Sequence, residues 1–198
     1  MKGQAAGRLR AASLVFASGV FLMTSVAALA QSAAPSGYGA TLRWYHEQAE
    51  AGNPVAQFLL GIKYETGTDV PKDLARAAQL FERAAKQGYT DAQFKLASLL
   101  ETGRGVAADR GAAEAWYRAA AFDGHAPAHY NLSLMLLSAA RDEDALVEGL
   151  SWLMRAGRGD VSQAGGLLAK WREIVSGDVM AQAEELSKLP LESGGASR

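Results

Sequence analysis

Residues 56–58 of this chain read Ala-Gln-Phe, residues 92–94 repeat that triplet, and residues 128–130 give the close variant Ala-His-Tyr. The step between successive copies is 36 residues. The same step separates Gly52, Gly88 and Gly124. A fixed period in the range of roughly 20–50 residues is typical of a solenoid, in which each unit buries its apolar face against its neighbours. The repeat therefore predicts a binding surface rather than a catalytic pocket, and it does not name the ligand.

Each unit is expected to hold two helices. The first helix, over residues 55–65 in the first unit, carries Ala56, Leu60, Gly61 and Tyr64 on one face of a 3.6-residue period. Its third member is small in every unit, which lets the partner helix approach closely. The second helices are expected over residues 73–86, 109–122 and 144–157. We therefore predict three units, at about residues 53–88, 89–124 and 125–160.

The ends of the second helices carry recognisable signals. Asp73 and Asp109 stand where an N-cap carboxylate would accept hydrogen bonds from first-turn amides. Gly88 and Gly124 suit the left-handed position after a helix. Trp44, Trp116 and Trp152 occupy one phase of the repeat, and we expect them in the core.

The two ends of the chain differ from the repeat. Residues 1–30 combine basic side chains, an apolar stretch and the terminus Ala28-Leu29-Ala30, as a secretory signal peptide does. Cleavage after Ala30 would leave Gln31 as the first residue; the alternative is an uncleaved membrane anchor. We expect a flexible leader over residues 31–39, a solenoid over residues 40–190 closed by a capping helix at about 178–189, and a disordered tail over residues 191–198.

Composition excludes several classes of partner. The chain has 198 residues, a formal net charge of −1 and no cysteine. Removing the three basic residues of the leader would bring the net charge to −1 − 3 = −4. A mildly acidic chain without a basic cluster argues against nucleic acid and anionic membranes. The absence of cysteine excludes disulfides and thiol chemistry.

The units resemble Sel-one-like repeats, a branch of the tetratricopeptide superfamily. The resemblance rests on Ala-x-x-x-Leu-Gly-x-x-Tyr at residues 56–64, the turn at residues 103–106 and the apolar series that follows Asp109. It implies an all-α, right-handed solenoid of antiparallel helix pairs that acts as an adaptor between proteins. The third unit departs from the pattern, because residues 138–141 lack the turn glycines.

The function predicted from these features is an exported, non-catalytic protein-binding module, monomeric and without a cofactor, in the periplasm or secreted. Two alternatives stay open: a cell-wall or β-lactam hydrolase, by analogy with cysteine-rich relatives, and a secreted host-interaction factor. An uncleaved leader would instead give a membrane-tethered scaffold.

The predicted partner-binding face is a ladder on the first helices, one unit apart. Its aromatic rings would contact an extended peptide, and polar side chains beside them would supply hydrogen bonds; packing of the rings between units is the alternative. His125 and His129 have the spacing of a helical metal pair, but Pro127 places His125 outside the helix, so no metal site is predicted. The proposed ladder comprises Phe58, Phe94, Tyr130, Gln57, Gln93, His129, Glu65 and Glu101.

Overall fold

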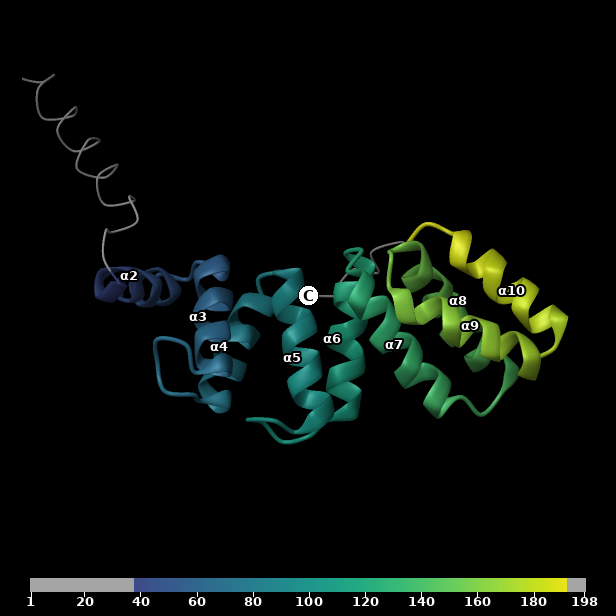
Figure 1. The fold of residues 1–198 in the computed structure, drawn as a ribbon, viewed down its shortest axis with the longest axis horizontal. Coiled ribbons are helices and arrows are strands. Elements are labelled where there is room, and N and C mark those ends of the chain that lie inside the picture. Colours follow the sequence, from purple (N-terminus) through teal and green to yellow (C-terminus); the bar gives the residue numbers. More distant parts are fainter. Residues whose placement is uncertain (1–37, 192–198) are drawn as a thin grey trace, which may run out of the picture. The chain divides into compact units, whose positions relative to one another are not determined.

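The structure is a computed structural model that describes residues 38–191, so the predicted leader at 1–30, most of the flexible segment at 31–39 and residues 192–198 lie outside it. Within the described range it contains nine helices and no strand (Figure 1). The helices are α2 (Tyr38–Glu50), α3 (Pro54–Thr66), α4 (Leu74–Ala85), α5 (Thr90–Thr102), α6 (Arg110–Phe122), α7 (Ala126–Ala139), α8 (Glu143–Arg158), α9 (Ser162–Ile174) and α10 (Gly177–Lys188).

Residue contacts divide the chain after Thr41. The described part of the first unit is the start of α2, which begins two residues before the predicted start at Ala40. The second unit, described over residues 42–191, holds all the features discussed below.

The helices of the second unit pair as the 36-residue period predicts. α3 packs with α4, α5 with α6 and α7 with α8, and each pair contacts the first helix of the next (Figure 1). The prediction of an all-α repeat solenoid is therefore confirmed.

In each second helix the fully buried residue is the one that directly follows the repeat position held by Trp116 and Trp152. Phe81, Tyr117 and Leu153 are each 0% exposed. Trp152 is buried, as expected, but Trp44 and Trp116 are half-buried, so the prediction that all three tryptophans are core was wrong for these two. A helix turns by 100° per residue, so a shift of one residue moves the fully buried position away from Trp116 and onto Tyr117.

The small residue on each first helix makes room for this core side chain. A Cβ atom on Gly61 would lie 2.6 Å from the ring of Phe81, closer than real contacts allow. Ala97 and Ser133 occupy the same position in the next units, and both are fully buried. The predicted packing role of the small residue is confirmed.

Loop chemistry follows the sequence in the first two units. The Asp73 and Asp109 carboxylates accept first-turn N–H groups at 2.9 Å, as predicted. Asp69 adopts φ 70° where the next unit has Gly105 at φ 77°. Only glycine fits at Gly105, because a Cβ atom there would lie 2.4 Å from the backbone of Leu74.

The third unit is built differently at its loop, in agreement with its missing glycines. The residue that caps the end of α7 is Ala140, with φ −59°, where α3 and α5 are each followed by a left-handed glycine. α8 begins at Glu143, one residue before the expected start, and Asp142 caps it by accepting the Ala145 N–H at 2.9 Å.

The last helix covers α8. α10 packs against α8 and buries Val179, Ala183 and Ser187. α9 also packs against α8, so both terminal helices lie on the same neighbour. This arrangement places the end of α10 beside the side chains described in the next section.

Tyr117 and Trp116 offer a direct test of which residue supports the core. We expect Tyr117→Ala to lower the free energy of unfolding by roughly 3–5 kcal/mol, the range for deleting a large buried aromatic side chain. Trp116→Ala should cost less, because that side chain is already half-exposed. Urea unfolding followed by circular dichroism measures both; a larger loss for Trp116→Ala would contradict the assignment.

Candidate functional site

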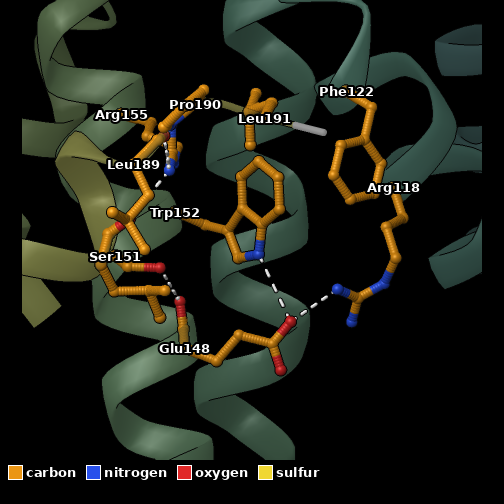
Figure 2. A pocket seen from close by; sticks show the side chains of 10 residues that line it. Arg118, Phe122, Glu148, Ser151, Trp152, Arg155, Leu189, Pro190 and Leu191 are labelled. Carbon is orange, nitrogen blue, oxygen red and sulfur yellow. Dashed lines mark hydrogen bonds and ion pairs between the residues drawn. The ribbon is translucent and has the colours of Figure 1, made fainter. Parts of the chain in front are cut away.

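A groove of about 440 Å³ lies between α6, α8 and the last described residues of the chain. We call it the Trp152 groove (Figure 2). It is lined by Arg118 and Phe122 of α6, by Glu148, Ser151, Trp152 and Arg155 of α8, and by Leu186, Leu189, Pro190 and Leu191.

Trp152 forms the aromatic wall of the groove. Its indole packs edge-on against Phe122, with ring centroids 5.6 Å apart and an interplanar angle of 89°. The indole N–H points to Glu148 Oε1 at a long 3.5 Å (Figure 2). His129 lies 5.4 Å from the same indole. The ring is therefore held in place on several sides, and the indole N–H has only a weak partner.

One rim of the groove is a network of charges. Arg118 donates hydrogen bonds to both Glu148 and Glu114, and both are ion pairs. Burial alone would lower the pKa of the Arg118 guanidinium, but its bonds to Glu148 and Glu114 shift that pKa upward overall. Arg118 is therefore a fixed cation that also holds Glu148 beneath the indole.

Arg155 supplies backbone-binding donors on the opposite side. Its Nη2 donates to the carbonyl oxygen of Leu186 at 2.9 Å and to that of Leu189 at 2.8 Å. Its guanidinium also lies 5.5 Å from the centre of the Trp152 ring. Among the residues that the structure describes, Arg155 forms no ion pair with a carboxylate. Its hydrogen bonds go to main-chain acceptors instead.

Arg158 reinforces the same contact one turn later on α8. It donates to the Ser187 side-chain oxygen at 3.0 Å and also to the Ser187 carbonyl. The last carbonyls of a helix lack their usual partners within the helix, and the two arginines bind carbonyls at the end of α10 and directly beyond it.

The residues that follow α10 form one wall of the groove. Leu189 is extended, with φ −62° and ψ 144°. Leu191 is half-buried and packs against the cluster that contains Trp152. The sequence assigned Leu191 to the tail, and the structure instead gives it an apolar contact that no local pattern encodes.

The aromatic rings of the predicted ladder lie between adjacent units. Phe58 lies 5.8 Å from Phe81 and 5.0 Å from Tyr89, measured between ring centroids. Phe94 stands in the same relation to Tyr117, at 5.7 Å, and to His125, at 4.6 Å.

Tyr130 is half-buried against the apolar cluster of the third unit. These contacts favour the packing alternative over a ladder of free rings.

The three polar side chains of the ladder are buried. Gln57, Gln93 and His129 are 1%, 6% and 8% exposed. Gln57 Nε2 donates to the Ala49 carbonyl at 3.0 Å, and His129 Nε2 lies 2.9 Å from the Ala121 carbonyl. Gln57 and His129 therefore already bind the end of the preceding second helix, whereas Gln93 Oε1 is buried without a hydrogen-bond partner. Their burial contradicts the expectation that these three side chains hydrogen-bond a partner on an open face.

The two glutamates of the ladder also have partners within the stack. Glu65 pairs with Lys95 at 2.8 Å, which links α3 to α5. Glu101 accepts the Tyr117 hydroxyl at 2.9 Å, and Asn131 donates to that hydroxyl at 3.0 Å. Burial raises the pKa of Tyr117 to about 12. These contacts connect neighbouring first helices.

Two further observations concern the described residues alone. No group of three or more potential ligands lies close enough to bind a metal ion in this part of the chain. None of the helices there has the length and apolar character needed to cross a membrane.

His125 caps α7 by accepting the Ala128 N–H, in agreement with its predicted place outside the helix.

Sequence reasoning missed most of the Trp152 groove. Trp152 was expected in the core, and its neighbours were not singled out. The available signal was a departure from the repeat: Arg118 and Phe122 stand where the preceding unit has Glu82 and Lys86. Phe122, an apolar ring at the position of the exposed Lys86, indicates that this surface of the second unit contacts something other than water.

Comparisons with known proteins agree with the fold. The Sel1 repeat family model matches residues 54–89 and 90–125, the first two units of the predicted three. The chain therefore contains two Sel1 repeats, the Sel-one-like repeats expected from the sequence. No curated protein matches the chain.

Two solved structures are similar over most of the chain. A Sel1 repeat protein from Oxalobacter formigenes is 27% identical, with a TM-score of 0.61 over 74% of this chain and 63% of that one. A protective antigen present in uropathogenic Escherichia coli strains, with an SLR fold, is 27% identical, with a TM-score of 0.63 over 73% of this chain and 32% of that one. This chain thus spans less than two thirds of either relative.

The two histidines of α7 predict a pH-dependent stability. Burial lowers the pKa of His129, and the charges of Arg155 and Arg158 lower it further. Burial also lowers the pKa of His125, against the effect of Asp91. Unfolded histidine takes up a proton near pH 6.5, so below that pH the unfolded chain binds more protons. We expect the free energy of unfolding to fall as the pH drops below about 6.5.

The repeat itself supplies the control. The first unit has Asn53 and Gln57 at the positions of His125 and His129. Asn53 accepts the Ala56 N–H as His125 accepts that of Ala128, and Gln57 binds the Ala49 carbonyl as His129 binds that of Ala121. The double variant His125→Asn, His129→Gln should lose less stability between pH 7.5 and pH 5.5 than the wild type in urea unfolding. An equal loss in both proteins would show that these histidines do not cause it.

Proposed function

We propose that this Sel1 repeat protein is an exported, non-catalytic adaptor that holds an extended segment of a partner protein in the Trp152 groove. The repeats and the SLR fold support a protein–protein interaction module. The Trp152 groove, the exported location and the extended segment are the finer parts of the proposal.

One observation carries the choice of this groove. Arg155 donates to two backbone carbonyls beside the Trp152 ring, so the groove already binds main chain next to an aromatic wall. Backbone acceptors are common to every peptide, and aromatic and arginine side chains are the residues that dominate binding energy at interfaces. This combination suits an extended polypeptide better than a small polar metabolite.

The proposal places the partner on the second helices instead of the first. The polar first-helix residues that the sequence favoured are buried or bonded within the stack, as the bonds of Gln57, Glu101 and His129 and the burial of Gln93 indicate. Phe122 is half-buried and Arg118 keeps about a third of its side chain exposed, so both remain within reach of a partner.

The exported location rests on residues 1–30, which have the composition of a cleavable leader. A protein exported in this way would act in the periplasm or outside the cell. The absence of cysteine is compatible with either, because such a chain needs no redox control to fold.

The partner is tested by crosslinked capture on the full chain from envelope and secreted fractions. We expect one stoichiometric protein, whose affinity falls roughly 30-fold in Phe122→Ala, since truncating a central aromatic contact costs about 2 kcal/mol or more. Lys86→Ala, at the same repeat position one unit earlier, is the matched control and should bind as the wild type does. Circular dichroism checks that both variants are folded.

Two results would count against the groove. One is a partner that Phe122→Ala retains at full affinity. The other is a folded wild-type bait that captures nothing in either fraction.

Export is tested separately by mass spectrometry of the protein recovered outside the cytoplasm. A mature chain that begins at Gln31 is the expected result. Recovery in the membrane fraction with residues 1–30 intact would instead favour the tethered scaffold.

A further inference from the structure

The last described residues line one side of the Trp152 groove, where Arg155 binds their main chain. We infer that Leu189-Pro190-Leu191 is an internal occupant of this groove, and that the partner segment that replaces it has the same chemistry: extended, with a proline between two apolar residues. This inference rests on the proposed function, because it names the class of segment that the adaptor binds.

The first argument is the main-chain contact. Leu189 lies beyond the end of α10, yet its carbonyl is bound by Arg155 at 2.8 Å. The Leu186 carbonyl, bound by the same nitrogen, belongs to the last turn of α10. Arg155 thus holds both the helix end and the first extended residue after it. The bond to the Leu189 carbonyl does not depend on helical geometry, so a carbonyl from another chain can take the place of that carbonyl.

The second argument is the conformation of the segment. Proline disfavours the helical conformation in the preceding residue and shifts it towards extended backbone, and Leu189 has ψ 144° before Pro190. Proline also has no N–H group, so the segment presents carbonyl acceptors to the arginine donors. Proline-containing extended segments are ordered before they bind, and aromatic-lined grooves are a common receptor for them.

The third argument is the unequal anchoring of α10 and of the segment after it. α10 buries Val179, Ala183 and Ser187, and Arg158 also binds Ser187. By contrast, Leu189 is 55% exposed and Pro190 is exposed, which leaves Leu191 as the main apolar contact. The segment can therefore leave the groove while α10 stays on α8.

This difference predicts competition within the molecule. A segment tethered directly beside its site has an effective concentration on the order of millimolar. If its intrinsic Kd is about 0.1 mM, it is bound about ten times as often as it is released, and a competitor binds about tenfold more weakly. Removing the internal segment should restore that factor.

The test uses a synthetic peptide with the sequence of residues 188–198, labelled at its N-terminus, so it needs no knowledge of the partner. We expect a chain that ends at Lys188 to bind this peptide about tenfold more tightly than the wild type does, and the full-length variant Leu191→Ser to approach that gain. A peptide carrying serine in place of Leu191 is the negative control. Tryptophan fluorescence and anisotropy report the binding.

A folding check keeps the result interpretable. Leu191→Ser retains every backbone carbonyl that Arg155 and Arg158 bind, so it remains a valid open variant if the shorter chain is unstable. Folded open variants that bind the peptide no more tightly than the wild type would overturn the inference.

The two proposals fail in different ways. Peptide exchange without any captured partner would overturn the proposed function alone and leave the internal occupant established. A captured partner that depends on Phe122, without peptide exchange, would overturn the internal occupant and its chemistry alone.

Discussion

The structure depends on the packing of each second helix on its first helix, through a large buried side chain on one and a small buried residue on the other. Phe81, Tyr117 and Leu153 are fully buried, and Gly61 could not carry a methyl group without meeting the Phe81 ring. Burial of such side chains is the main favourable term available to a chain without disulfides. The contact fixes the distance between paired helices, and every surface described above is positioned by it.

A polar residue that recurs at the same position of the repeat can join one unit to the next, and it is then not free to bind a partner. Gln57 and His129 bind the carbonyls that end the preceding second helix, although one is an amide and the other an imidazole. Positions that keep the period therefore serve the stack. The groove arises where the period breaks, at Arg118, Phe122 and the third unit.

The C-terminal end combines stability and recognition in the same side chains. Arg155 and Arg158 bind carbonyls at the end of α10 and directly beyond it, and Arg155 also packs on the Trp152 ring. A guanidinium carries several donors in a fixed plane, so one arginine can cap a helix and bind an extended segment together. This double role explains why the groove lies at the closing helix of the solenoid.

The sequence by itself determined the helix pairs, their caps at Asp73 and Asp109, and the turn residues Asp69 and Gly105, because these follow from local spacing and backbone sterics. It did not determine which ring is buried, since Trp116 and Tyr117 differ by a single residue and by the angle at which the helices meet. Nor could it place Leu191 against the Trp152 cluster, 39 residues away in the chain. Only the tertiary structure decided these points, because they depend on contacts between distant segments that no local pattern encodes.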